Sequence, residues 1–244
     1  MLSRKLVALA GLCALTLPVA AEDFWVKKPY QRWSAEETSR MLQDSPWAIT
    51  QILRTSSNPS AIIGNNPTTG PAVLPGLESE GQVDPAISYI IQIRSAAPIR
   101  EAMVRSSQLR AHYGAMSSDQ KTAFDVNAEK FLAASFPESI LVTVSFHSNI
   151  HNYQGMLQSY WQAQSAAKLN TSVYLNAGAD RLRLTGYAFK DDTVQFAFPR
   201  PKQLTPEMPF SVEFVHPEID RLGEQRVRVN FKLKNMLLND KLVL

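Results

Sequence analysis

The sequence predicts an α+β fold, with N-terminal helices, a mostly antiparallel sheet and a β-rich C-terminal half. Segments with helical spacing of apolar residues gather before residue 165, and alternating segments dominate after residue 169. The two kinds of segment do not alternate regularly along the chain. Helices first and strands last are typical of α+β folds that contain antiparallel sheets.

The first 21 residues have the features of a secretory signal peptide. Arg4 and Lys5 give a positive start, residues 6–20 form an apolar run, and Val19-Ala20-Ala21 offers small residues for cleavage. The run is shorter than the ~20 residues of a comfortable membrane span. We therefore expect an exported protein, periplasmic or extracellular, with no transmembrane span after signal cleavage.

Cleavage after residue 21 changes the composition in two ways. Of the 25 lysines and arginines, 23 remain to face 22 acidic residues, and this near-neutral charge gives no reason to expect nucleic acid as a partner. The single cysteine, Cys13, is removed, so the mature chain cannot use disulfides, thiolate catalysis or cysteine-ligated metals. No other apolar run approaches a membrane span, so we expect a soluble mature protein.

Residues 22–244 are expected to form a single domain. The aromatic-rich segment 24–33 is expected to be extended. Ser34 and Glu37 form a capping box, which predicts a helix that ends near Asp44 because Pro46 follows. A short strand is predicted from Trp47 to Arg54. Residues 55–84 combine four of the ten glycines with four prolines and show no periodicity, which predicts a disordered loop.

The rest of the chain carries clear periodicities. Alternation at Ile87, Tyr89, Ile91 and Ile93 is typical of a strand, and Pro98 suits the first turn of a helix. Helices are predicted at 98–113, 118–132 and 150–165, and strands at 87–94, 140–146, 171–176, 181–189, 193–198, 210–215, 225–234 and 241–244. Lys190-Asp191-Asp192 is expected to form a hairpin turn.

His147 and His151 are weak candidates for metal ligands. Two imidazoles four residues apart can chelate zinc when they share a helix face. However, His147 ends a predicted strand and the next helix begins near Ile150, so the pair is better interpreted as two surface histidines. No cofactor is indicated, because the phosphate loop and the dinucleotide fingerprint are absent. The nucleophile elbow is absent as well, which lowers the odds of that class of hydrolase.

The aromatic residues near the N-terminus have two interpretations. They could form a platform that stacks on sugars or bases, or they could be buried and fix the N-terminal segment to the core. Because large aromatic side chains bury much area, we expect the second, and we predict that Trp47 is buried. The residues concerned are Phe24, Trp25, Tyr30, Trp33 and Trp47.

A row of basic residues is the clearest electrostatic feature. Arg226, Arg228, Lys232 and Lys234 alternate with Val227, Val229, Phe231 and Leu233. One interpretation is a docking strip for an anionic polymer or lipid headgroup. The other is a solvated outer face, or a charged edge strand that prevents aggregation. Glu213 on the preceding predicted strand is a possible partner for these charges.

Four blocks of sequence, taken in order, resemble a family of uncharacterised secreted bacterial proteins. The blocks are Trp33-Ser34 with Asp44-Ser45-Pro46-Trp47-Ala48; Arg94-Ser95-Ala96-Ala97-Pro98-Ile99-Arg100-Glu101-Ala102; Phe198-Pro199-Arg200 with Val212-Glu213-Phe214-Val215; and Phe231-Lys232-Leu233-Lys234-Asn235-Met236 with Lys241-Leu242-Val243-Leu244. The chain departs from the family pattern at Ile93, Asn235 and Asp240, where that pattern favours Trp, Asp and Gly. The resemblance implies a secreted protein of this architecture and no activity, ligand or catalytic residue.

Two functions are compatible with these observations. We expect an exported, non-enzymatic binding or envelope-associated module, whose partner is an envelope protein or an anionic surface. The alternative is a periplasmic hydrolase with an unmotifed site that uses His147 or His151. A histidine that meets an acid at a pocket would favour the hydrolase.

Overall fold

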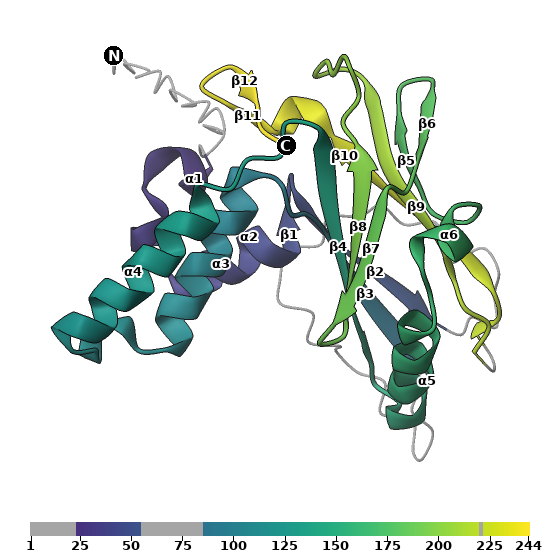
Figure 1. Cartoon of the computed structure of the whole chain (residues 1–244), viewed down its shortest axis with the longest axis horizontal. Coiled ribbons are helices and arrows are strands. Elements are labelled where there is room, and N and C mark those ends of the chain that lie inside the picture. The colour runs from purple at the N-terminus through teal and green to yellow at the C-terminus, as the bar shows by residue number, and fades with distance from the viewer. Residues whose placement is uncertain (1–22, 55–84, 220–221) are drawn as a thin grey trace, which may run out of the picture.

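The computed structural model describes residues 23–54, 85–219 and 222–244. Within them the predicted α+β fold is confirmed: the N-terminal helices gather at one end, and a strand-rich part built from antiparallel sheets follows (Figure 1). The predicted signal peptide and the predicted loop at 55–84 lie outside the described residues. No helix within the described residues has the length and apolar character that crossing a membrane requires.

Helix α2 (Ala35–Gln43) begins at the capping box that the sequence predicts. In the helix after Ser34, the Ser34 hydroxyl accepts from the backbone N–H of Glu37, and the Glu37 carboxylate accepts from the N–H of Ser34. Ser117 and Gln120 form a second capping box. The α-helices are α1 (Phe24–Lys27), α2 (Ala35–Gln43), α3 (Ala97–Arg110), α4 (Ser118–Leu132), α5 (His151–Gln162) and α6 (Ala166–Leu169), and the 3-10 helices are η1 (Tyr30–Arg32), η3 (Tyr113–Ala115) and η5 (Leu233–Asn235).

The strands form three antiparallel sheets. The strands are β1 (Asp44–Ser45), β2 (Ala48–Arg54), β3 (Ala86–Ile93), β4 (Ser139–Ser148), β5 (Tyr174–Ala177), β6 (Asp180–Arg183), β7 (Gly186–Lys190), β8 (Thr193–Pro199), β9 (Pro209–His216), β10 (Gln225–Lys232), β11 (Leu237–Leu238) and β12 (Lys241–Leu242). The first sheet has the order β1-β2-β3-β4-β8-β7, the second has the order β10-β9-β5-β6, and β11 pairs with β12.

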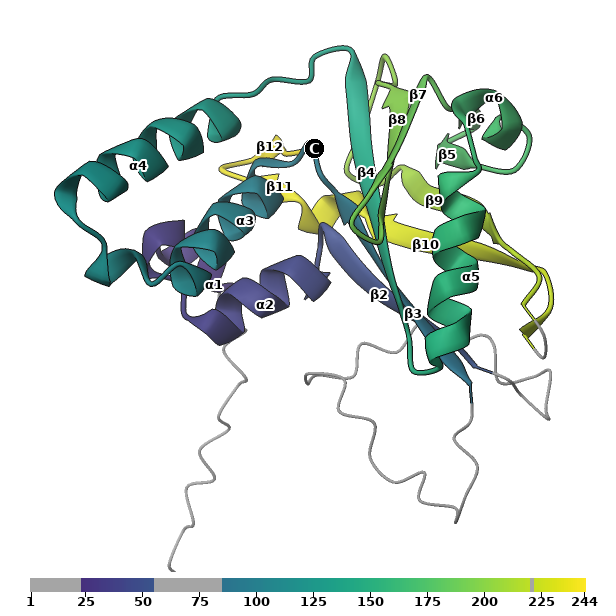
Figure 2. The same cartoon turned by 60° about the horizontal axis from the view of Figure 1, so that its bottom comes forward.

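The two larger sheets pack against each other through their apolar faces. Alternate residues of β3 are buried, and β9 is buried along most of its length. The ring of Tyr89 on β3 lies edge-on to that of Phe214 on β9, with centroids 5.2 Å apart. Helix α5 adds Trp161, whose ring contacts Phe196 of the first sheet and Phe214 of the second. The helix therefore lies alongside the strands and packs on both sheets (Figure 2).

The expectation of an extended segment at residues 24–33 is wrong. The chain forms the single turns α1 and η1, separated by Pro29. These turns let the Phe24 ring lie edge-on to those of Trp25 and Trp33, with centroids 4.9 and 5.3 Å apart. The aromatic residues therefore pack on one another and on the core, as the second interpretation expected.

The predicted strand at 181–189 is two strands in different sheets. β6 belongs to the second sheet and β7 to the first, and the buried Leu184 lies at the crossing between them. β7 begins at Gly186, where an added Cβ would lie 3.2 Å from the Cβ of Ala197 on β8. The close approach of the two backbones explains the glycine. The predicted turn after β7 is confirmed, and Asp191 and Asp192 both have positive φ, as in a type I′ hairpin.

The last strand of the chain is shorter than the predicted strand at 241–244. β12 covers only Lys241–Leu242, and it pairs with β11, which the sequence pattern did not predict. Asn239 and Asp240 have positive φ in the turn between them, a conformation that both residue types tolerate. β10 ends at Lys232, so Lys234 belongs to η5 and not to the predicted strand 225–234.

Candidate anion-binding face

The candidate site is the outward face of the second sheet, which we call the basic face. Val227, Val229 and Phe231 of β10 are buried against the first sheet, so the residues between them point the opposite way. The register of the sheet places the matching residues of β9, β5 and β6 on the same side. The basic face comprises Arg181, Arg183, Tyr174, Asn176, Ser211, Glu213, Arg226, Arg228, Asn230 and Lys232.

Cationic side chains lie on both edge strands of this sheet. Arg226, Arg228 and Lys232 come from β10, and Arg181 and Arg183 come from β6. All five are exposed. The two edge strands are three strand spacings apart, or roughly 14 Å. The predicted basic row on β10 is therefore one side of a wider charged surface.

Glu213 joins the two cationic rows. It lies on β9 directly opposite Arg228, and its side chain is only 9% exposed. Its Oε1 accepts from Arg181 Nη2 at 2.9 Å and also from Arg226 Nη1. The guanidinium of Arg181 also stacks over the ring of Tyr174, 3.7 Å from its centroid. The predicted partnership of Glu213 with the basic row thus holds for Arg226, and Arg181 shares the same oxygen.

The other three cations of the basic face have no carboxylate partner among the described residues. Arg228 Nε donates to Ser211 Oγ at 3.3 Å, and Arg183 and Lys232 make no ion pair or hydrogen bond there. Among the described residues of the face, Glu213 is the sole carboxylate, so five positive charges meet one negative charge and leave a net charge of +4. Such a surface attracts anions.

The outward face of the first sheet is different. Its central positions carry neutral side chains, and the register puts the charged residues Arg54 and Lys190 only at strand ends. The neutral residues include Thr50, Ile90, Gln92, Thr143, Ser145 and Gln195. The positive charge is therefore a property of the outward face of the second sheet and is not shared by that of the first.

Sequence reasoning found part of this site. Arg226, Arg228 and Lys232 are on the face as predicted, whereas Lys234 lies beyond the end of β10 in η5. Arg181 and Arg183 were missed, although they alternate with Leu182 and Leu184 in the same manner. What the sequence did not indicate was that β6 and β10 are the two edges of one sheet.

The two candidate metal ligands lie on different elements, as the sequence indicated. His147 is near the end of β4 and His151 is the first residue of α5, and both are exposed. The hydroxyl of Ser88, opposite His147, donates to the carbonyl oxygen of His147 at 3.4 Å rather than to its ring. Within residues 23–54, 85–219 and 222–244, no three His, Cys, Asp or Glu side chains are grouped so that they could hold a metal ion.

A third histidine is buried in the core. His216, at the end of β9, is 0% exposed, and its Nδ1 lies 2.6 Å from the hydroxyl oxygen of Tyr89 on β3. Its Nε2 has no hydrogen-bond partner among the described residues. Burial lowers the pKa of His216 from an ordinary 6.5 to about 4, and burial raises the pKa of Tyr89. The pair links the two sheets, and its burial does not suit it to meet a substrate.

Comparison with known proteins adds little. The chain matches no protein-family model and no curated protein. One solved structure is similar, a protein of unknown function from Burkholderia pseudomallei, with 9% sequence identity and a TM-score of 0.40. The similar region covers 62% of this chain and 79% of that chain. A likeness at this level supports no argument about function.

Proposed function

We propose that this protein is an exported, non-enzymatic module that docks on an anionic surface of the cell envelope through the basic face. The observation that carries the proposal is the net charge of +4 on one outward sheet face, where a single carboxylate offsets five exposed cations. Each Lys or Arg held near an anionic lipid surface contributes about 1 kcal/mol of attraction. The export component rests on the sequence of residues 1–21.

The chemistry that this face fits is an array of closely spaced phosphate, carboxylate or sulfate groups. Alternate residues along β10 are roughly 7 Å apart, and the cationic rows of β6 and β10 are separated by about 14 Å. Arginine guanidinium groups bind such oxyanions through paired hydrogen bonds. Arg228, Arg183 and Lys232 are the residues most available for this, because they have no carboxylate partner in the described structure.

Cosedimentation with vesicles tests the proposal. The mature chain should bind vesicles of phosphatidylglycerol and phosphatidylcholine at low ionic strength and should leave pure phosphatidylcholine vesicles unbound. Binding should weaken steeply with added salt, because charges are screened over about 10 Å at 0.1 M. The double variant Arg228→Glu, Lys232→Glu brings the face from +4 to 0, so its affinity should fall by roughly tenfold or more.

A matched control separates the face from overall charge. Arg110 on α3 and Lys130 on α4 are exposed, have no ion pair in the described structure, and belong to the helices at the other end of the molecule (Figure 1). Arg110→Glu, Lys130→Glu makes the same change in net charge and should keep most of the binding. Equal loss in both double variants would contradict a localised site. A parallel titration with dextran sulfate distinguishes a lipid surface from an anionic polymer.

The alternative function, a hydrolase that uses His147 or His151, finds less support. Neither imidazole forms an ion pair or a hydrogen bond with an acid in the described part of the chain. Ser88 beside His147 is bonded to the backbone and is not positioned as an activated nucleophile. The binding role therefore has a specific observation behind it that the hydrolase lacks.

A further inference from the structure

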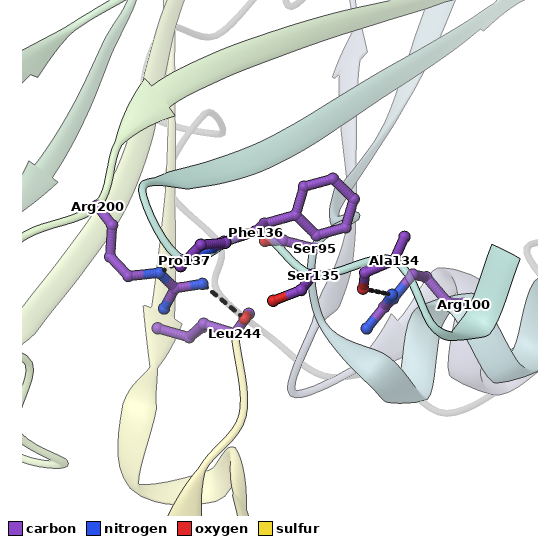
Figure 3. Close-up of a pocket in the computed structure, with 8 residues that line it drawn as sticks. All are labelled: Ser95, Arg100, Ala134, Ser135, Phe136, Pro137, Arg200 and Leu244. Atoms are coloured by element: carbon purple, nitrogen blue, oxygen red, sulfur yellow. Dashed lines mark hydrogen bonds between the residues drawn. The ribbon is translucent and has the colours of Figure 1, made fainter. Parts of the chain in front are cut away.

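Away from the basic face, Arg100 and Arg200 line a hollow of about 260 Å³ (Figure 3). Arg100 comes from α3, Arg200 follows β8, and Ser135 and Phe136 belong to the connection between α4 and β4. Segments distant in sequence thus meet where the helices join the strands. Figure 3 shows the two guanidinium groups on opposite sides of the hollow, with the Ser135 hydroxyl between them.

Hydrogen bonds hold the Arg100 side chain in place but do not satisfy all of its donor nitrogens. Arg100 is only 9% exposed. Its Nη1 donates to the carbonyl oxygen of Leu132 at 3.0 Å and also to that of Ala134. These contacts satisfy carbonyl groups at the C-terminal end of α4. The guanidinium carbon lies 5.5 Å from the centroid of the Phe136 ring. Its Nε is buried and has no partner among the described residues.

Arg200 approaches the hollow from the sheet side. Its Nε donates to the carbonyl oxygen of Phe136 at 3.2 Å, and its Nη2 donates to the backbone oxygen of Leu244 at 3.0 Å. Its Nη1 makes no hydrogen bond with the described residues. The side chain is therefore anchored by the carbonyl of Phe136 and the terminal carboxylate of Leu244, and it keeps one donor nitrogen available.

Arg200 is paired with the terminal carboxylate of Leu244, whereas Arg100 has no carboxylate partner among the described residues. No Asp or Glu among the described residues lies within 4.0 Å of either guanidinium group. Burial lowers the pKa of both arginines, which reflects the unfavourable loss of water around two cations. Arg100 is buried, and a buried cation is costly unless it is paired, so an anion in the hollow would stabilise this arginine.

We propose that this hollow is a binding site for a small organic oxyanion, a carboxylate or a phosphate, held between Arg100 and Arg200 with the Ser135 hydroxyl as a further donor. Guanidinium groups are suited to such planar or tetrahedral oxyanions. The volume lies just below the common range of about 300–1,000 Å³ for ligand pockets, which favours a small ligand. The face of Phe136 and the side chain of Leu244 provide an apolar border for a short organic substituent.

Titration followed by two-dimensional NMR tests this proposal. Acetate and inorganic phosphate are added separately to the mature chain in a buffer without other oxyanions, with sodium chloride at matched ionic strength as the reference. Saturable shifts of the amide signals of Ser95, Ser135 and Phe136 are expected with at least one of the two anions. The relative affinities show whether the site takes carboxylate or phosphate.

Three variants make the test specific. Arg200→Gln should weaken binding by roughly tenfold or more, because it removes a charge-assisted hydrogen bond. Ser135→Ala, at an exposed residue, should weaken it less and leave the melting temperature unchanged, which guards against a loss of binding through unfolding. Arg110→Gln, at an exposed residue of α3 outside both candidate sites, should bind as the wild type does. No saturable shift with either anion, or equal binding by wild type and Arg200→Gln, overturns the proposal.

Discussion

At the scale of single residues, Trp47 shows how one side chain joins separate parts of the molecule. It is 0% exposed, its ring lies edge-on to that of Trp25, and its indole Nε1 donates to the backbone oxygen of Val243 at 2.7 Å. The sequence predicted the burial from the Pro46 helix stop and the apolar strand that follows. The bond to a residue almost two hundred positions away was not predictable, because nothing local to either residue indicates it.

Trp47→Ala should therefore lower the free energy of unfolding by about 3–5 kcal/mol, the range for a large aromatic side chain lost from a core. The unpaired carbonyl of Val243 adds to the loss. Urea unfolding followed by circular dichroism measures the difference. Val26→Ala is the control, since Val26 is 55% exposed and its truncation should change stability little. A Trp47→Ala variant as stable as the wild type would show that Trp47 does not pack as described.

His216 makes the stability of the protein depend on pH. Its folded-state pKa of about 4 lies below the ordinary value of 6.5, so between these values the unfolded chain binds the proton and the folded chain does not. The contribution of His216 is therefore fully present above pH 6.5 and is lost as the pH falls towards 4. Between pH 7 and pH 5 this loss amounts to about 2 kcal/mol.

Urea unfolding at several pH values tests this behaviour. The wild type should lose stability from pH 7 to pH 5, and His216→Gln should lose about 2 kcal/mol less over the same interval. The difference between the two proteins isolates His216, because the acidic residues contribute equally to the pH dependence of both. The same pH dependence in both proteins would mean that His216 is not buried in its neutral form.

At the scale of the elements, helix α5 contains an interior glycine with no structural need for it. Gly155 is exposed, and a Cβ built there meets no atom within 4 Å. Gly186 at the start of β7 is the opposite case, because its added Cβ lies 3.2 Å from that of Ala197. Packing therefore requires a glycine at position 186 but not at position 155.

Gly155→Ala should raise the free energy of unfolding by about 0.5–1 kcal/mol, because alanine loses less backbone freedom on entering a helix. Gly186→Ala should give no such gain, since β8 must shift to accommodate the methyl group. Thermal unfolding of the two variants beside the wild type measures both. A destabilised Gly155→Ala protein would indicate that something packs against this face of α5.

At the scale of the whole molecule, one hydrophobic core joins the helices to the strands. It is continuous from Trp33 and Met41 near the helices, through the inner faces of both sheets, to Leu244. The C-terminal segment contributes to this union, because Val243 bonds to Trp47 and Leu244 bonds to Arg200. The C-terminus lies between the helices and the strands in both views (Figures 1 and 2).

The sequence by itself determined most of the local structure. The capping box at Ser34, the hairpin turn at Asp191 and the alternation in β3 and β10 all depend on neighbours along the chain, and all were predictable. The wrong predictions concern features that do not depend on neighbours along the chain. The sequence over 181–189 does not show that the chain leaves one sheet for another, because that depends on which strands lie beside it.

The tertiary structure decided which residues meet at the two candidate sites. Arg181 and Arg226 share an oxygen of Glu213 only because β6 and β10 are the outer strands of one sheet, with β5 and β9 between them. Arg100 and Arg200 face one hollow only because α3 meets the end of β8. Strand order and the meeting of distant elements minimise the free energy of the whole core, so short-range sequence patterns do not encode them.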